Sequence, residues 1–383
     1  MSAPSPIDIS ASTAAGAHSE VRAIEEQLVL VLQGGGALGA YQAGVYEALM
    51  EGGIEPDWVI GTSIGAINGA IVAGNEPKNR IARLREFWDG ASKSRVHDSI
   101  WPAAMFGNMV ANLSTIVNGV PGFFLPNAQA LWGPRFPVGV EHAAYYTTDP
   151  LKDTLSRLVD FDYINQKHVR LTVGAVNVRT SEMRYFDSRS MPLGVAHVMA
   201  SGALPPAFPA VAIDGEHYWD GGIYSNTPIE VVLDDVPRRN SVIFTADVWQ
   251  SNGEEPTTIQ QAAARQKDIQ YASRSTTHVA RQAQIHRLRH VVRELAKRIP
   301  AELSEDPVVK DLAEYGCGTL MHLVRLQSPR LENEDHTKDI DFTRAGIENR
   351  WKAGRDHARK ALAEKPWEAA SDMLSGIVIH DAG

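Results

Sequence analysis

A serine between two glycines is the first segment of this 383-residue chain whose residue types could do chemistry. The segment Gly61-Thr62-Ser63-Ile64-Gly65 follows the apolar run Trp58-Val59-Ile60. In a G-x-S-x-G turn between a strand and a helix, the glycines let neighbouring backbone approach closely and leave the serine hydroxyl exposed at the carboxyl end of a sheet. Ser63 is therefore the predicted nucleophile of an acyl transfer, and Gly61 and Gly65 are the glycines of its turn.

A second glycine-rich turn, Gly34-Gly35-Gly36-Ala37-Leu38-Gly39, follows the apolar run 28–32 about thirty residues earlier. Such a turn next to the serine supplies backbone N–H groups where the negative oxygen of a tetrahedral intermediate develops. The helix that should begin at Ile64 adds the positive end of its dipole. We expect the oxyanion hole to consist of the N–H groups of Gly34, Gly35, Gly36 and Ile64, with Gly39 as a further glycine of this turn.

Asp220 is the best-placed base for the serine. It ends a predicted strand, and Gly221 and Gly222 leave room for its carboxylate to face a neighbouring turn. A free aspartate, with a pKa of about 3.9, is a poor base for a serine hydroxyl, so the site must exclude water and thereby raise the proton affinity of the carboxylate. This mechanism requires no metal and no cofactor.

Three other kinds of site are considered for these motifs: a dinucleotide site, a Walker phosphate loop and a Ser-His-Asp triad. Gly34, Gly36 and Gly39 also fit the dinucleotide pattern G-x-G-x-x-G, but the next strand ends in glycine, threonine and serine rather than in the acidic residue that would hold a ribose. No Gly-Lys-Ser/Thr follows, as a phosphate-binding Walker loop would require. A Ser-His-Asp triad would need a histidine after the acid, and the chain offers several there: His278, His286, His290, His322, His336, His357 and His380.

The elements predicted around these motifs alternate between strand and helix. Strands are expected at 28–32, 58–60, 170–177, 183–186, 211–213, 216–219, 241–248 and 320–326. Helices are expected at 39–51, 64–73, 77–88, 150–159, 194–201, 226–233, 258–299 and 345–363. The alternation predicts a mostly parallel sheet covered by helices.

The three motifs together, in this order, resemble those of the patatin-like phospholipases, a family that includes bacterial patatin-like serine acyl hydrolases. The resemblance covers about 28–248 and includes the linking segment 200–209. It implies an α/β fold of three layers with helices on both faces of a mostly parallel central sheet, a Ser63/Asp220 dyad, and hydrolysis of acyl esters in lipids. We expect a disordered tail at 1–26, a catalytic domain at 27–250, and a mainly helical C-terminal region at 251–383 that packs on the catalytic domain.

Composition indicates the compartment of the protein and the kind of partner it binds. The single cysteine, Cys317, and the absence of a secretory pattern at the N-terminus indicate a cytoplasmic protein. The net charge of −9 argues against nucleic acid as a partner. The stretch 265–298 nevertheless holds nine basic and two acidic residues. It is either an amphipathic helix packed on the core with a solvated basic face, or a peripheral contact with anionic lipid at the inner membrane.

The segment 92–146 lacks clear periodicity and is rich in aromatic residues. It is either a buried connection or a lid and acyl-chain wall. Three functions stay open on the sequence alone. The first is hydrolysis of phospholipids or other acyl lipids, the second is hydrolysis of another hydrophobic ester such as a polyhydroxyalkanoate, and the third is an inactive scaffold that binds lipid or a partner.

Overall fold

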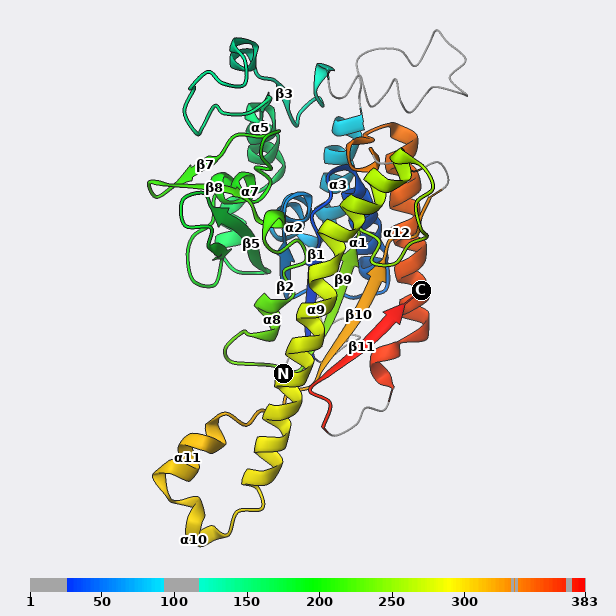
Figure 1. The fold of residues 1–383 in the computed structure, drawn as a ribbon. Helices are drawn as coiled ribbons and strands as arrows, with labels where there is room; N and C mark the ends of the chain where they lie inside the picture. Colours follow the sequence, from blue (N-terminus) through cyan, green and yellow to red (C-terminus); the bar gives the residue numbers. More distant parts are fainter. Residues whose placement is uncertain (1–25, 93–116, 332–333, 335–336, 370–373, 383) are drawn as a thin grey trace, which may run out of the picture.

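A nine-stranded sheet forms the centre of the computed structural model, which describes residues 26–92, 117–331, 334, 337–369 and 374–382, without the side chains of 273–275 (Figure 1). The expected tail, apart from residue 26, and the first part of the aromatic segment, 93–116, lie outside the described residues. The strands are β1 (Gln27–Leu32), β2 (Trp58–Gly61), β3 (Leu125–Pro126), β4 (Tyr146–Thr147), β5 (Arg170–Asn177), β6 (Met183–Asp187), β7 (Val211–Ile213), β8 (Glu216–Asp220), β9 (Ser241–Asp247), β10 (Met321–Gln327) and β11 (Ile377–Ala382).

The helices connect these strands. They are α1 (Ala40–Glu51), α2 (Ile64–Ala73), α3 (Pro77–Ser92), α5 (Asp149–Leu158), α6 (Phe161–Asn165), α7 (Val195–Ser201), α8 (Glu230–Leu233), α9 (Ile259–Ala296), α10 (Ala301–Ser304), α11 (Pro307–Glu314) and α12 (Arg344–Glu364). Short 3₁₀ turns are η1 (Gly36–Gly39), η2 (Ala128–Trp132), η3 (Gly221–Ile223), η4 (Lys338–Ile340) and η5 (Pro366–Glu368). No helix in these described ranges has both the length and the apolar character needed to cross a membrane.

The strand order of the main sheet is β11-β10-β9-β1-β2-β5-β8-β7, and β6 also pairs with β5. The pairs from β11 to β5 are parallel, whereas β6, β7 and β8 pair antiparallel. Helices cover both faces, so the predicted three-layer, mostly parallel fold is confirmed. Besides helices, the C-terminal region supplies two strands that extend the same sheet beyond β9: β10, which matches the strand predicted at 320–326, and β11, which was not predicted.

The sheet presents a different set of side chains to each helical layer. On one face, Leu28, Leu30 and Leu32 of β1 belong to a core shared with α1, α2, α3 and α12. On the other face, Val29 and Val31 pack with residues of α8 and α9. This alternation of buried residues along one strand explains why its sequence reads as a continuous apolar run, as expected for a parallel strand covered on both faces.

One edge of β5 brings two distant strand ends together. β6 occupies the other edge, because Val173 pairs with Phe186 and Ala175 with Arg184. On the edge opposite β6, Val173 pairs with Gly61 of β2 and Ala175 pairs with Asp220 of β8. The two partners therefore lie two residues apart along β5, about 7 Å. The turn after β2 and the end of β8 must meet at this point.

The C-terminal region contacts the catalytic core through a close crossing of α12 over α1. A Cβ on Gly354 would overlap the backbone carbonyl oxygen of Tyr41, and a Cβ on Gly44 would overlap that of Trp351. The two glycines thus let the helix backbones touch.

α9 begins beside the core, and its C-terminal part projects beyond the body with α10 and α11 as an arm of residues 285–315 (Figure 1).

We predict that Gly354→Ala lowers the free energy of unfolding by about 1–3 kcal/mol, because an added methyl group must push α12 away from α1. Gly90→Ala is the matched control: Gly90 also lies in a helix, α3, but a Cβ there has no heavy atom within 4 Å. Helix propensity favours alanine equally at both sites, by up to about 1 kcal/mol. Urea unfolding measures both variants, and equal stability of the two would contradict the close crossing.

Candidate active site

Ser63 lies in a strained turn between β2 and α2. Its backbone has φ 57° and ψ −123°, a conformation that side-chain-bearing residues rarely adopt and that often marks a functional site. A Cβ on Gly65 would overlap the carbonyl oxygen of Leu32, and a Cβ on Gly61 would overlap Gly65. The Ser63 N–H donates to the carbonyl and hydroxyl oxygens of Ser201, each at 3.1 Å. The glycines and Ser201 together hold the turn in this shape.

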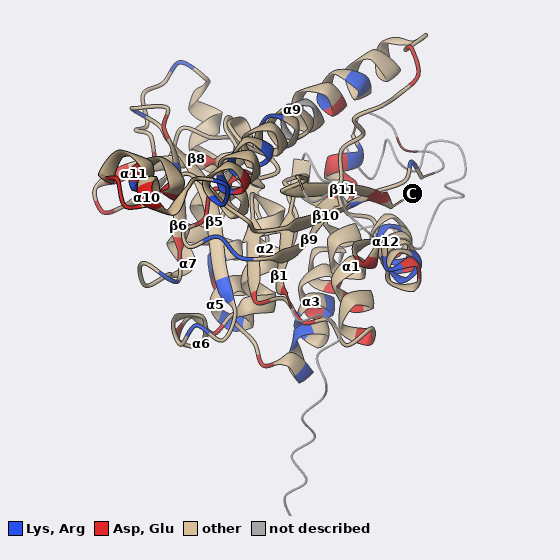
Figure 2. Ribbon diagram, turned by 90° about the horizontal axis from the view of Figure 1, so that it is seen from below, with Lys and Arg blue, Asp and Glu red and all other residues tan. Residues whose placement is uncertain are grey.

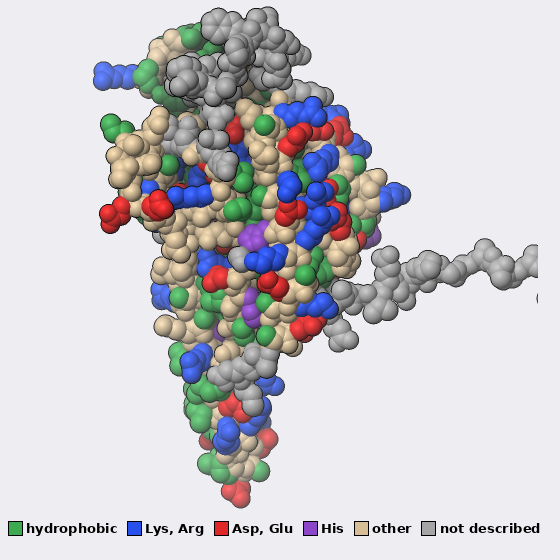
Figure 3. Space-filling view, turned by 90° about the vertical axis from the view of Figure 1, so that its right-hand side faces the viewer, with side chains coloured by type: hydrophobic (Ala, Val, Ile, Leu, Met, Phe, Trp, Pro, Cys, Tyr) green, Lys and Arg blue, Asp and Glu red, His purple; other side chains and the backbone are tan. Residues whose placement is uncertain are grey.

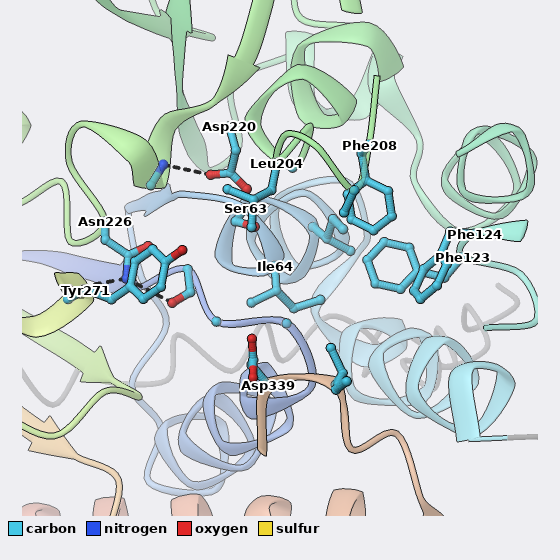
Figure 4. Close-up of a pocket in the computed structure, with 18 of the residues that line it drawn as sticks. Ser63, Ile64, Phe123, Phe124, Leu204, Phe208, Asp220, Asn226, Tyr271 and Asp339 are labelled. Carbon is cyan, nitrogen blue, oxygen red and sulfur yellow. Dashed lines mark hydrogen bonds between the residues drawn. The ribbon is translucent and has the colours of Figure 1, made fainter. Parts of the chain in front are cut away.

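Asp220 is the last residue of β8 and its carboxylate faces Ser63 (Figure 4). The residue is 2% exposed. The carboxylate accepts a hydrogen bond from the backbone N–H of Gly222 at 2.7 Å, and the Ser63 hydroxyl lies beside it. Burial raises the pKa of Asp220 from 3.8 to about 7, although the Ser63 hydroxyl and the Gly222 N–H both act in the opposite direction. A carboxyl group with this pKa can take and return a proton near neutral pH.

The glycine-rich turn lies on the other side of Ser63, and its N–H groups divide into two classes. The N–H of Gly34 donates to the carbonyl oxygen of Asn226 at 3.1 Å, so Gly34 has no donor left for an oxyanion. The expectation for this residue was therefore wrong. Within the described ranges, the N–H groups of Gly35, Gly36 and Ile64 have no acceptor in the chain, and all three residues line the pocket. They are the donors that the structure leaves available.

Buried side chains fix the carbonyl groups of this turn. The Gly34 carbonyl accepts from Asn226 Nδ2 at 3.0 Å and from Trp249 Nε1 at 2.7 Å. The amide of Gln33 accepts from the backbone N–H groups of Val248 and Trp249, at 2.6 and 3.0 Å, and donates to Thr227 Oγ1 at 2.7 Å. Asn226, Trp249 and Gln33 are functional positions that the motifs did not indicate.

The remaining motif glycines make room for close packing around the site. A Cβ on Gly39 would press on Ile64, and one on Gly221 would overlap the backbone of Gly174 in β5. A Cβ on Gly222 would crowd the side chains of Asn226 and Asp220. These glycines therefore let the two catalytic turns approach each other and the sheet.

The pocket around Ser63 has two unlike walls (Figure 4). On the side of Phe208, aromatic and aliphatic side chains form a continuous apolar surface, made of Ile64, Ile67, Phe123, Phe124, Tyr146, Leu204, Phe208, Ile340 and Phe342. On the other side stand Asn226 and Tyr271, with the Tyr271 ring packed on Trp249 at a centroid distance of 4.8 Å. The described lining residues include no Lys, Arg or His. Burial, followed by the nearby carboxylates of Asp220 and Asp339, raises the pKa of Tyr271, so its hydroxyl stays protonated.

The C-terminal region supplies part of this pocket. Tyr271 comes from α9, and Asp339, Ile340 and Phe342 come from the segment at η4. Gly36, at φ +55°, lies so close to Asp339 that a Cβ would overlap the Asp339 carbonyl oxygen. The Asp339 carboxylate pairs with Lys267 of α9 at 2.7 Å, which ties η4 to the long helix. Residues after 250 therefore support the turn that carries the available donors.

The histidines that follow Asp220 are engaged elsewhere. His286 and His290 bond the carbonyl oxygens of Leu233 and Thr319, and His357 bonds the hydroxyl of Tyr41. His322 and His380 stack on each other in β10 and β11, and His278 lies 3.6 Å from Glu230. His336 lies outside the described residues. None of the described histidines lines the pocket of Ser63, which favours the two-residue arrangement over a triad.

Known proteins resemble this chain in sequence and, more distantly, in structure. Among curated proteins, the chain is 29% identical over 206 residues to Patatin-like phospholipase domain-containing protein ZK370.4 of Caenorhabditis elegans, and 31% identical over 210 residues to Patatin-like phospholipase domain-containing protein 6 of Homo sapiens. Each alignment covers 53% of this chain but only 12% of the relative. A 44-residue stretch is 61% identical to Lysophospholipase nte1 of Aspergillus terreus, over 12% of this chain and 3% of the relative. The solved structure of VipD from Legionella pneumophila aligns at 15% identity with a TM-score of 0.40, over 89% of this chain and 67% of that one.

Two family models together cover most of the chain. The model described as Patatin-like phospholipase matches residues 30–233, and the model described as Patatin phospholipase matches residues 269–374. The first match contains both glycine-rich turns and Asp220, and the second contains Tyr271 and the η4 segment. Because the first model alone spans just over half of the 383 residues, the chain belongs to the patatin-like phospholipase family.

Proposed function

We propose that the chain hydrolyses carboxylic esters of acyl lipids, with Ser63 as the nucleophile and Asp220 as the base. One observation carries the proposal: the Ser63 hydroxyl lies beside a buried carboxylate whose pKa burial raises to about 7. The family match and the names of the phospholipase relatives support the same substrate class.

The first half of the reaction forms an acyl-enzyme. The Ser63 oxygen attacks the ester carbonyl carbon while its proton passes to the Asp220 carboxylate. The carbonyl oxygen becomes an oxyanion, for which the N–H groups of Gly35, Gly36 and Ile64 are the available donors. When the intermediate collapses, the carbon–oxygen bond to the alcohol breaks and Asp220 returns the proton to that oxygen. The alcohol leaves and the acyl group stays on Ser63.

The second half releases the acid. Asp220, ionised again, takes a proton from water as the water oxygen attacks the acyl carbon, and the same N–H groups stabilise the second oxyanion. Collapse breaks the bond to Ser63, whose oxygen recovers the proton from Asp220. The products are a fatty acid and the free enzyme, with no net change in protons on the site.

The two pocket walls suggest how the ester lies. The apolar wall from Ile64 to Phe208 fits an acyl chain, whereas Asn226 and Tyr271 offer polar groups to the alcohol half of the ester. No feature of the pocket specifically favours a polyhydroxyalkanoate, and an intact nucleophile and base speak against an inactive scaffold. Turnover of phospholipid, lysophospholipid, triacylglycerol and polyhydroxyalkanoate, compared side by side, tests the substrate class.

Contact of the basic stretch 265–298 with anionic lipid is a separate proposal. The stretch lies in α9, where one face is buried against the core through residues such as Ala272, Val279 and His286. Arg281, Arg287 and Arg293 are exposed on the helix, and Figure 2 shows basic residues along α9. A packed apolar face and a basic face open to lipid are therefore compatible in the same helix.

Ser63→Ala and Asp220→Asn should each abolish turnover of p-nitrophenyl butyrate while the protein stays folded. The first removes the attacking oxygen, and the second keeps the shape of Asp220 but cannot accept the proton. The histidines at 278, 286, 290, 322, 357 and 380 serve as controls, because loss of any one of them should leave most of the activity. A histidine variant that folds normally yet loses activity by orders of magnitude would replace the dyad with a triad.

The activity should rise with pH through about 7, because Asp220 must be ionised to accept the proton of Ser63.

The raised pKa of Asp220 also affects stability. An unfolded aspartate has a pKa of about 3.9, so between roughly pH 4 and 7 the folded state binds a proton at Asp220 that the unfolded state has lost. This carboxyl group therefore lowers the free energy of unfolding as pH rises through that window. Asp220→Asn should therefore unfold at a higher temperature than wild type at pH 8, with a smaller difference at pH 5. A kcat/KM profile that stays flat down to pH 5 would contradict the raised pKa.

Gly36→Ala should reduce kcat by about 10²–10³ if the overlap with the Asp339 carbonyl displaces one oxyanion donor. Gly53→Ala is the matched control, since Gly53 also has a positive φ, +71°, but a Cβ there meets no atom within 4 Å. Both variants carry the backbone strain of a left-handed residue, about 1 kcal/mol. Only Gly36→Ala should lose activity, and equal activity of the two variants would exclude the turn from the oxyanion hole.

A further inference from the structure

The part of the aromatic segment that the structure describes contains an apolar surface beside the pocket. Residues 125–146 include one histidine and only two charged side chains, those of Arg135 and Glu141. Several large apolar side chains of this segment face solvent: Leu125, Leu131, Trp132, Phe136 and Tyr145. Leu131 is 88% exposed and Trp132 is 61% exposed, and the Trp132 and Phe136 rings meet edge to face at 5.0 Å. Such a concentration of exposed apolar groups marks an interaction surface.

This surface, the 125–146 loop, is continuous with the apolar wall of the pocket. It leaves the body directly after Phe124 and returns at Tyr146, two lining residues whose rings meet at 4.9 Å. The strands β3 and β4 pair at its base, Leu125 with Thr147 and Pro126 with Tyr146. An apolar path therefore runs from the exposed tip to the wall that faces Ser63.

Hydrogen bonds hold the base of the 125–146 loop in place. The Asn127 side-chain amide donates to the carbonyl oxygens of His142 and Ala144, at 3.0 and 2.9 Å, and the Asn127 backbone N–H donates to the carbonyl oxygen of Tyr145. The backbone N–H groups of Tyr145 and Tyr146 in turn donate to the carbonyl oxygens of Pro206 and Ala207, at 3.1 and 3.0 Å. The segment 200–209 also carries Phe208 of the pocket, so the loop and the pocket wall are parts of one structure.

The chemistry of the 125–146 loop fits a lipid–water interface. Tryptophan and tyrosine favour that boundary because each combines a large apolar ring with a polar group. One arginine and one glutamate leave no net charge to select anionic lipid. An ester that enters along Phe124 and Tyr146 from such an interface would keep its acyl chain in apolar surroundings throughout.

We propose that the 125–146 loop inserts Leu131, Trp132 and Phe136 into the surface of aggregated, zwitterionic or neutral lipid and thereby places the pocket at that surface. The role in substrate delivery rests on the proposed function, whereas the binding itself does not require catalysis.

A second exposed apolar surface lies on the arm formed by residues 285–315 (Figure 3). It is lined by Ile285, Leu288, Val292, Leu295, Ile299, Val309, Leu312 and Tyr315. Leu288 and Leu312 are 65% and 60% exposed. Figure 1 shows the arm and the 125–146 loop at opposite ends of the molecule. Leu295 follows Tyr271 of the pocket by 24 residues in α9, which corresponds to about 36 Å along the helix. Lipid bound by the tip of the arm would lie far from Ser63.

Vesicle sedimentation with the full chain tests the proposal. The loop variant Leu131→Ser/Trp132→Ser/Phe136→Ser is compared with the arm variant Leu288→Ser/Leu312→Ser and the charge variant Arg287→Gln/Arg293→Gln, with folding checked by circular dichroism. The probes are vesicles of phosphatidylcholine alone and of phosphatidylcholine with phosphatidylglycerol. We expect the loop variant to bind phosphatidylcholine vesicles at least about tenfold more weakly, because three apolar side chains no longer leave water. The arm and charge variants should bind these vesicles as wild type does.

Hydrolysis separates this proposal from the proposed function. The loop variant should lose hydrolysis of vesicle phospholipid but keep turnover of p-nitrophenyl butyrate, since none of its three residues lines the pocket. Loop-dependent binding without any esterase activity would leave the lipid surface in place and remove the proposed function. Wild-type binding by the loop variant would overturn the proposal. It would also be overturned if binding were confined to anionic vesicles and lost in the charge variant, or lost only in the arm variant.

Discussion

The contact between the Ser63 hydroxyl and the buried Asp220 carboxylate is the one on which the rest of the site depends. A carboxylate with no cationic partner is costly to bury, and the described residues of this pocket include no Lys, Arg or His. The Gly222 N–H and the Ser63 hydroxyl compensate only in part, which is why the pKa rises to about 7. The same cost raises the proton affinity of Asp220, which the proposed two-residue mechanism uses.

The sheet topology makes this contact and the later part of the chain maintains it. β2 and β8 end on the same edge of β5, so the residues after Gly61 meet Asp220 although about 160 residues separate them in sequence. The glycine-rich turn is then held between Asn226 and Trp249 on one side and Asp339 on the other. Residues after 250 thus belong to the site as well as to the central sheet, which β10 and β11 continue.

Local sequence predicted the parts of the site that local geometry creates. The serine turn, the glycine-rich turn and the strand end at Asp220 each depend on neighbours in sequence, so their glycines and apolar runs indicate them. Gln33, Asn226 and Trp249 could not be found in this way, because their partners lie about 190 to 215 residues away. The same reason explains the error at Gly34, whose N–H is taken by a tertiary contact with Asn226. The strand β11 was missed because its apolar run, Ile377-Val378-Ile379, is only three residues long and is followed directly by His380 and Asp381.

In the proposed mechanism, a base whose pKa is raised by burial sets a requirement on how substrate arrives. Water that followed the ester into the pocket would solvate the Asp220 carboxylate and lower the proton affinity that the mechanism uses. The apolar wall that includes Phe124, Tyr146 and Phe208 accommodates an acyl chain more readily than water. If the 125–146 loop beside this wall rests on lipid, as proposed, the acyl chains of the aggregate replace water there. Lipid as well as protein then keeps water away from Asp220. The exposed apolar groups of the 125–146 loop and the raised pKa of Asp220 are then consequences of one physical demand.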